Sequence, residues 1–135
     1  PSAVDLYPLA VCAATAQVVY HYLPDGHRAE LTIGQDVREA LWVAGSRQGC
    51  LRQAPAIFVI TAIYDRTAAK YGKLAKRCVK LEAGHAAQNL LLKAVALELG
   101  AVPIGAFLDE EVSSALRLRP EEAPVYLIPA ARAKT

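Results

Sequence analysis

The 135-residue sequence contains no methionine, one tryptophan and only three cysteines. Cys12, Cys50 and Cys78 are odd in number and widely spaced. This pattern supports neither a disulfide framework nor a zinc site with closely spaced thiols, and free thiols buried in the core are the simplest expectation. We therefore predict no metal site.

Long apolar runs and an excess of charge of one sign are also missing. Gln, His, Asp, Lys or Arg interrupts every hydrophobic stretch before it reaches the roughly 18 to 20 residues that cross a bilayer. The start of the chain lacks the basic and apolar regions of a secretory signal. The net charge is only +2, with both signs interspersed, unlike the basic patch of a nucleic-acid binder. These absences predict a soluble, cytoplasmic protein that binds neither membranes nor nucleic acid.

The hydrophobic content is high, at 54%, which is enough for a substantial core. No repeat, low-complexity tract or long linker divides the sequence. We therefore predict one domain over residues 1–135.

The first half of the chain predicts strands around one helix. Residues 9–22 and 28–33 flank the turn signal Pro24-Asp25-Gly26 and predict a β-hairpin. Apolar residues at helical spacing predict a helix from Gln35 to about Ser46, followed by a loop ending at Pro55. The β-branched and aromatic run at 56–64 predicts a central strand.

The second half predicts mainly helices. A short helix is expected over 65–69 and a long one from about Leu74 to Leu99, which Gly100 would stop. An extended segment over 101–107, a helix over 109–116 and a strand over 124–128 complete the order, with Asp65 and Asp109 expected to cap their helices. This order predicts an α+β fold.

The long predicted helix is apolar over most of its circumference, so we expect burial on several sides. Four polar residues nevertheless occur within two turns: Glu82, His85, Gln88 and Asn89. If buried, they need partners in the core, across a dimer interface or on a ligand, and the pattern does not choose among these. Beyond the helix, Gly100 and Gly105 bracket a segment containing Pro103, whose backbone can approach a flat partner closely.

Several short segments carry a resemblance to a known family. They are Pro1-Ser2-Ala3 with Leu6-Tyr7-Pro8, Tyr20-His21-Tyr22, Lys70-Tyr71-Gly72, Leu81-Glu82-Ala83-Gly84-His85 with Gln88-Asn89, Val102-Pro103-Ile104-Gly105-Ala106-Phe107, and Tyr126-Leu127-Ile128-Pro129. In this order and spacing they resemble the flavin-dependent nitroreductase family, and within it the SagB-type dehydrogenases that oxidise azolines in modified peptides. The chain resembles the C-terminal two thirds of such a protein, without the family's N-terminal arginine segment that grips the FMN phosphate.

The resemblance implies a mixed sheet flanked by helices and a homodimer formed through the long helix, with FMN at the subunit interface. Pro103, Ile104 and Gly105 would then lie along the isoalloxazine ring. Ser2 would touch the flavin of the other subunit. Arg132 would contact the phosphate, although Ala131 replaces the family's glycine.

The resemblance also implies catalytic roles for Lys70 and Tyr71. Azoline oxidation removes a hydride from one carbon and a proton from its neighbour, so a base is required beside the flavin. Lys70 would be that base, and Tyr71 would orient it or relay the proton. Read without the resemblance, the same pair is a solvated lysine and a packing aromatic at a helix end.

Two other functions fit the same sequence. A nitroreductase that takes electrons from NAD(P)H would use the same flavin without a nucleotide-binding loop. A flavin-free scaffold subunit is the second alternative, suggested by the missing phosphate-gripping segment. The sequence also has Asp5 where many nitroreductases have Asn, and a carboxylate beside a reduced, anionic flavin would be unfavourable. The expected function is oxidation of an azoline-containing peptide or a related small molecule.

Overall fold

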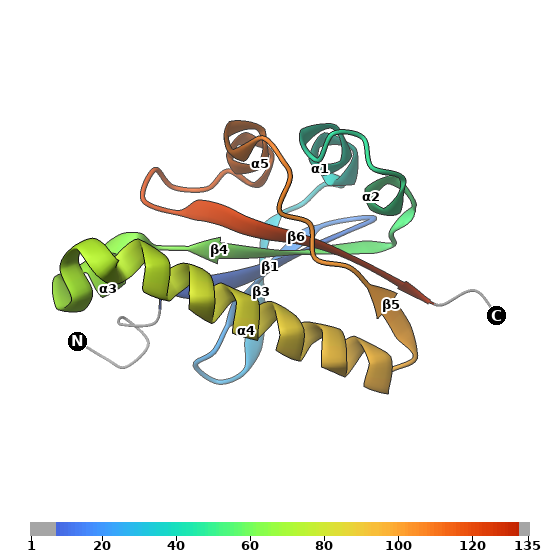
Figure 1. Cartoon of the computed structure of the whole chain (residues 1–135). Helices are drawn as coiled ribbons and strands as arrows, with labels where there is room; N and C mark the ends of the chain where they lie inside the picture. The colour runs from blue at the N-terminus through green and yellow to red at the C-terminus, as the bar shows by residue number, and fades with distance from the viewer. Residues whose placement is uncertain (1–7, 133–135) are drawn as a thin grey trace.

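The computed structural model describes residues 8–132, which form a six-stranded sheet covered by helices on both faces (Figure 1). The strand order is β3-β2-β1-β4-β6-β5. The strands are β1 (Leu9–Thr15), β2 (Val19–Leu23), β3 (Arg28–Ile33), β4 (Ala56–Ala62), β5 (Leu99–Ala101) and β6 (Ala123–Arg132). The α+β class is confirmed. All five neighbouring pairs in the described part of the chain are antiparallel, where a mixed sheet was expected.

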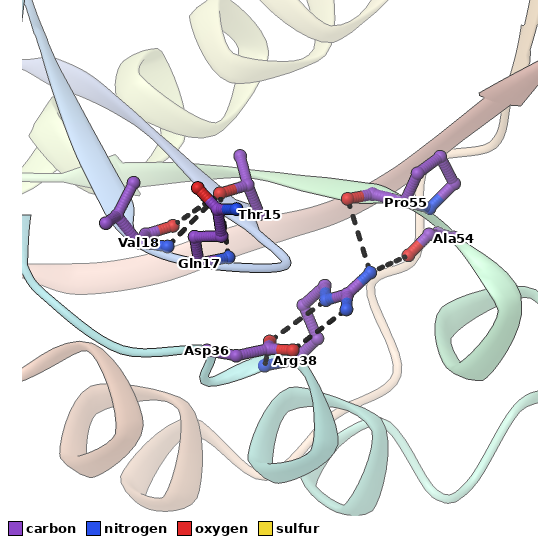
Figure 2. Close-up of polar contacts among 7 residues, drawn as sticks. All are labelled: Thr15, Gln17, Val18, Asp36, Arg38, Ala54 and Pro55. Atoms are coloured by element: carbon purple, nitrogen blue, oxygen red, sulfur yellow. Dashed lines mark hydrogen bonds and ion pairs between the residues drawn. The ribbon is translucent and has the colours of Figure 1, made fainter.

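The N-terminal strands form two hairpins, because residues 9–22 are divided into β1 and β2. The Thr15 hydroxyl donates to the Val18 carbonyl at 2.9 Å and accepts the Val18 N–H at 3.2 Å, which closes the turn (Figure 2). The prediction of one strand here was wrong, since a side chain makes this turn without glycine or proline. The second hairpin is confirmed, with the His27 N–H bonded to the Pro24 carbonyl at 3.1 Å.

One face of the sheet carries the long helix. β4 lies between β1 and β6, which confirms its predicted central position. α3 (Tyr64–Tyr71), a 3-10 turn (Gly72–Leu74) and α4 (Ala75–Ala96) follow it and cover this face (Figure 1). The core between α4 and the sheet contains Leu9, Ile60, Ala62, Val79, Ala83, Ala87 and Ile128. No helix within residues 8–132 combines the length and apolar character that a bilayer crossing requires.

The opposite face carries α1 (Arg38–Ala44), α2 (Gly49–Gln53) and α5 (Asp109–Leu116) (Figure 1). α2 replaces part of the expected loop, because five residues are too few to show helical periodicity. The largest fully buried side chains contributed by these helices are Leu41, Leu51 and Val112. Trp42 packs against the same core, and the guanidinium carbons of Arg52 and Arg47 lie 4.5 and 5.7 Å from its ring centroid.

Helix ends differ from the expected capping. α4 ends at Ala96, and Glu98 takes the left-handed conformation (φ 61°) that a glycine was expected to supply. Gly100 belongs to β5 instead. Asp65 and Asp109 lie in the first turns of α3 and α5 without a capping hydrogen bond, so they favour the helix starts through the helix dipole rather than as caps.

A charged clamp fixes the start of α1 against the start of β4. Arg38 donates to both carboxylate oxygens of Asp36, at 2.9 and 2.8 Å, and to the carbonyls of Ala54 and Pro55, at 3.1 and 3.4 Å (Figure 2). The Asp36 carboxylate also accepts the Arg38 backbone N–H at 3.0 Å. These hydrogen bonds lower the pKa of Asp36, so the carboxylate stays charged when most others have become protonated.

Candidate functional site

The sheet ends in an open edge formed by β5 and the segment that follows it. β5 pairs with the last residues of β6, and the chain continues beside β6 through residue 104. Ile104 donates its N–H to the Leu127 carbonyl at 2.7 Å and accepts the Leu127 N–H at 3.0 Å. The Ile104 side chain is only 6% exposed and belongs to the core on the α5 side. Ile104 therefore anchors the segment to the sheet.

The anchoring of Ile104 decides where its neighbours point. In an antiparallel ladder the backbone groups of alternate residues face opposite sides of the strand. Both backbone groups of Ile104 face β6, so regular alternation would turn the Pro103 carbonyl and the Gly105 N–H toward the open edge, and both residues are exposed. Space beside Gly105 is also free, because a Cβ added there would meet nothing within 4 Å. The result is a strip of exposed backbone that a flat ligand can approach.

Arg132 lies on the same edge as this strip. It is an exposed residue at the end of β6, paired through its backbone with Leu99. It lines an open cavity of about 740 Å³ together with Val102, the β5 residues Gly100 and Ala101, the end of α2 and residues 129–131. Arg132 therefore lies at the opposite end of this strip from Gly105. Its cavity also includes Val102, which is part of the strip.

Lys70 and Tyr71 lie at the end of α3, in a different cavity. This cavity has a volume of about 390 Å³ and is lined by Pro8, Arg66, Thr67, Lys70, Tyr71, Cys78, Val79 and Glu82. The Lys70 ammonium nitrogen lies 5.3 Å from the Tyr71 ring centroid, a cation–π contact that orients the amine. Both side chains are exposed in the single chain.

A third cavity, of about 430 Å³, contains Gly105. Its walls are Tyr64 of α3, Lys76 and Lys80 of α4, Phe107, Asp109 of α5, and residues 123–126 of β6. Of the residues predicted to form one site, Lys70 with Tyr71, Gly105 and Arg132 therefore line three separate cavities of the single chain, whereas Pro103 and Ile104 line none of the three. Ser2, the predicted contact from a second subunit, lies outside the described residues.

The polar residues of α4 do not lie in the core of the single chain. Glu82, His85, Gln88 and Asn89 are all exposed. They share this outer surface with large apolar side chains, because Leu81, Leu92 and Val95 are 58%, 59% and 72% exposed. The outer stripe of α4, defined as Leu81, His85, Gln88, Leu92 and Val95, follows the alternating four- and three-residue spacing of helices that pack lengthwise on a partner. The stripe carries no acidic or basic side chain other than the imidazole of His85.

Sequence reasoning missed a polar cluster at the splayed end of β1 and β2. Cys12 and His21 are cross-strand partners, with Cys12 Sγ 3.7 Å from His21 Nδ1. Nearby, the buried Thr61 hydroxyl donates to Glu122 at 2.5 Å. Burial, and then the charge of Glu122, raise the pKa of Cys12 to about 12, so this thiol is neutral and a poor nucleophile. These residues are far apart in the sequence and come together only through the strand register, so no local motif predicts the cluster.

His21 and Glu122 also line a cavity of about 310 Å³ with apolar walls that include Leu9, Val11 and Ile60. Among residues 8–132, no group of three or more His, Cys, Asp or Glu side chains is arranged to hold a metal ion. This cavity is separate from the three that contain the predicted site residues.

Comparison with known proteins identifies relatives of this architecture. The nitroreductase family model matches residues 1–132. The Methanocaldococcus jannaschii protein MJ1384, provisionally named a nitroreductase, is 36% identical over 138 residues, an alignment that covers 98% of this chain and 69% of that protein. A solved structure from Anabaena variabilis, also provisionally described as a nitroreductase, is 28% identical with a TM-score of 0.89 and covers 97% of this chain.

Two more distant solved structures share the fold alone. They are the Escherichia coli microcin synthetase McbBCD complex with truncated pro-MccB17 (22% identity, TM-score 0.84) and the Vibrio harveyi NADPH:FMN oxidoreductase complexed with NAD+ (19% identity, TM-score 0.68). Each covers 100% of this chain. The chain spans 28% of the Anabaena structure, 55% of the matched Escherichia coli chain and 54% of the Vibrio protein. On the family match and the 36% identity to MJ1384, the chain belongs to the nitroreductase family.

Proposed function

We propose that this chain forms a flavin-dependent oxidoreductase that binds FMN along the open edge from Arg132 to Gly105. The observation that carries the proposal is the exposed backbone strip held in place by the Ile104–Leu127 pair. A planar ring needs a wall without protruding side chains, and Gly105 provides one because the space beside its Cα is open. Family membership supports the assignment, since nitroreductase-family proteins generally use flavin.

The residues present fit the flavin in two respects. The outward Gly105 N–H would donate to a ring atom, and the Pro103 carbonyl would accept from one. Arg132, at the other end of the edge, would supply a charge-assisted hydrogen bond to the phosphate. Ile104 would act through its neighbours, because its side chain is in the core and its backbone groups already bond Leu127. When bound, the flavin would supply the two-electron redox chemistry that side chains lack.

We propose that a second copy of the chain completes the site. The outer stripe of α4 is exposed, contains no Asp, Glu, Lys or Arg, and is regular in spacing, and its three large apolar residues stay more than half exposed in the single chain. Packing this stripe against the same stripe of a second copy would remove that apolar area from water and give the polar residues partners. Such a homodimer would also bring the cavity of Lys70 and Tyr71 in one subunit toward the partner subunit.

The proposed substrate is an azoline-containing peptide or a related small molecule, as in SagB-type dehydrogenases. Lys70, in its uncharged form, would accept the proton from the carbon next to the one that loses hydride. Lys70 and Tyr71 are neighbours at the end of α3, with the Lys70 nitrogen 5.3 Å from the Tyr71 ring centroid, so the tyrosine would help to orient the amine for this transfer. The McbBCD complex, whose structure contains a truncated pro-MccB17, supports a peptide substrate by its likeness of fold.

Flavin uptake tests the proposal directly. Purified protein mixed with FMN and then desalted should retain the visible flavin absorption, and denaturation should release it. Lys70→Ala should keep this absorption but lose at least about 100-fold in the rate of azoline oxidation, the usual contribution of a general base. Lys73→Ala, which removes a neighbouring exposed lysine, is the matched control.

The outcomes separate the three functions. A colourless protein that does not bind added FMN would refute the proposal and would favour the scaffold function. Flavin reduction by NAD(P)H with turnover of nitro compounds, and none of azolines, would assign the nitroreductase function, for which the Vibrio harveyi oxidoreductase is a precedent of fold. Normal azoline turnover by Lys70→Ala would remove Lys70 from the mechanism.

A further inference from the structure

The start of α4 lies in a region of concentrated positive charge. Six of the fifteen lysines and arginines of the chain lie within residues 66–80, and no aspartate or glutamate does. Outside this range the acidic residues outnumber the basic ones, so the net charge of +2 masks an asymmetric distribution. The low net charge therefore does not describe this part of the surface.

Three of these cations gather on the first turns of α4. Lys76, Arg77 and Lys80 are all exposed, and spacings of three and four residues place Lys80 beside both of the others on the helix surface. These three residues define the basic surface. None of them takes part in the ion pairs found within residues 8–132. Within the described part of the chain, their charges are therefore not neutralised.

The basic surface opposes the electrostatics of its own helix. The start of a helix is the positive end of its dipole, where acidic side chains are stabilising and basic ones are not. The first turn of α4 contains no acidic residue, whereas Asp65 and Asp109 occupy the first turns of α3 and α5. Lys76 and Lys80, one turn apart, also repel each other. An anionic partner would relieve both effects, so the basic surface favours one.

An exposed leucine adjoins the basic surface. Leu74 is 61% exposed and lies three residues before Arg77, on the same side of the helix start. It belongs neither to the outer stripe of α4 nor to the cavities described above. A partner that combines acidic groups with one apolar side chain would complement both the leucine and the cations.

The size of the basic surface restricts the class of partner. Residues 74–80 extend about 9 Å along the helix, at 1.5 Å per residue. An extended peptide covers this length with about three residues. A nucleic acid would continue past it onto the rest of the chain, where acidic residues outnumber basic ones and repel phosphate. A short acidic peptide segment avoids this repulsion.

We propose that the basic surface docks an acidic segment of the peptide substrate, with one apolar side chain of that segment against Leu74. Only the 3-10 turn Gly72–Leu74 separates the start of α4 from Lys70 and Tyr71, so a peptide held here stays close to the proposed base. The identification of the docked peptide as the substrate rests on the proposed function. The docking surface itself is a property of the chain with or without flavin.

Fluorescence anisotropy of short rhodamine-labelled peptides tests the docking surface, on the full chain and without added FMN. One peptide has glutamates on both sides of a leucine, and its control has glutamines in place of the glutamates. The wild type should bind the glutamate peptide at least about tenfold more tightly, because charge-assisted contacts are the stronger ones. Raising the salt from about 50 mM to about 500 mM should reduce this preference, since ions screen exposed charges.

Charge reversal identifies the residues involved. Arg77→Glu/Lys80→Glu should weaken binding of the glutamate peptide at least about tenfold and leave the glutamine peptide unchanged. Circular dichroism should show a folded variant, because both side chains are exposed and glutamate suits the start of a helix. Lys93→Glu reverses a charge in the last turn of α4 and should bind both peptides like the wild type. Leu74→Ala should weaken both peptides alike, because it removes their common apolar contact.

Equal affinity of the wild type for the two peptides would overturn the inference, and so would full binding of the glutamate peptide by the charge-reversal variant. Single-stranded DNA and phosphatidylserine vesicles are the competing partners. Binding of either that depends on Arg77 and Lys80, without a preference for the acidic peptide, would assign a phosphate-bearing partner and refute the proposal.

The outcomes are separable from those of the flavin test. Charge-dependent docking in a protein that never takes up FMN would support the surface and refute the proposed function. FMN uptake without charge-dependent docking would do the reverse. Where both hold, an azoline peptide flanked by glutamates should have a lower KM than one flanked by glutamines, and Arg77→Glu/Lys80→Glu should abolish the difference. Equal KM values in the wild type would show that the docked peptide is not the substrate.

Discussion

Ile104 and Leu127 exchange both of their backbone hydrogen bonds, at 2.7 and 3.0 Å, across the last pairing of the sheet edge. This pair lies beyond β5, where the regular ladder has already ended at Ala101. It therefore fixes the backbone on both sides of Ile104 without a further strand. This one pair is the basis for expecting the Gly105 N–H to point toward the open edge.

Replacing Gly105 with proline should weaken FMN binding by roughly tenfold, because it removes the outward N–H and so one hydrogen bond to the ring. The residue before a proline must be extended, which Ile104 already is in its bridge to Leu127, so the fold should be retained. Fluorescence titration of FMN would measure the dissociation constant.

Gly105→Ala is the matched control for this substitution. It keeps the N–H, and its Cβ would meet nothing within 4 Å in the described chain. Near-normal affinity of the alanine variant together with weak binding by the proline variant would identify the N–H as the cause. Equal affinities for all three proteins would show that the flavin does not use this group.

Leu92→Glu should convert the expected dimer to a monomer, raising the dissociation constant by at least about tenfold, because it places a charge within the proposed helix contact. Leu92 is 59% exposed in the single chain, so the substitution should leave the subunit folded. Light scattering after size exclusion would give the mass. Lys93→Glu, one residue away and outside the stripe, should remain dimeric. A monomeric wild type would contradict the proposed interface.

Asp36→Asn should lower the free energy of unfolding by about 1 kcal/mol at pH 7, the upper end for a partly exposed ion pair. Because the folded state lowers the pKa of Asp36 below 3.8, this stabilisation is present above that pH and is lost as the pH falls through the lowered value. Urea unfolding curves of wild type and variant should therefore differ at pH 7 and converge in strong acid.

Glu121→Gln provides the comparison for the clamp. Its ion pair with Arg119 is longer, at 3.4 Å, and the two side chains are 41% and 66% exposed. Removing this charge should change stability by much less than Asp36→Asn does. Comparable losses for the two variants would mean that the clamp to Ala54 and Pro55 adds nothing.

The three thiols should differ sharply in reactivity toward Ellman's reagent at pH 8. Cys50 is exposed and should react at once, and Cys78, which is half-buried, should follow more slowly. Cys12 is buried, and its pKa is raised to about 12, so almost none of it is the reactive thiolate. It should react only after denaturant is added. Rapid titration of all three thiols in the native protein would contradict the buried position of Cys12.

Strong local signals predicted the fold where they existed. The turn at Pro24–Gly26 and the apolar run of β4 are both found where expected. The turn after Thr15 was missed because it depends on a hydroxyl group, which has no distinctive composition. The end of α4 was misplaced because Glu98, rather than a glycine, adopts the left-handed conformation. A local side-chain hydrogen bond makes the first of these turns, and at Glu98 a residue other than glycine adopts a backbone conformation that its intrinsic propensity does not favour.

The candidate site was less accessible to sequence reasoning. Motifs pointed to Lys70, Gly105 and Arg132, but the single chain distributes them over three cavities. Sequence order cannot show which groups a second subunit would unite. The role of Ile104 as an anchor also depends on its pairing with Leu127, which only the sheet register reveals.

Trp42 is the one tryptophan in the sequence, and α1 places it on the face of the sheet opposite α4 (Figure 1). The guanidinium groups of Arg47 and Arg52 contact its ring, and these contacts would be lost if α1 and α2 separated. Intrinsic fluorescence therefore monitors one side of the molecule by itself. Emission should change when that helical layer opens and stay constant when two subunits associate through the other side, which gives an optical means of separating unfolding from dissociation in unlabelled protein.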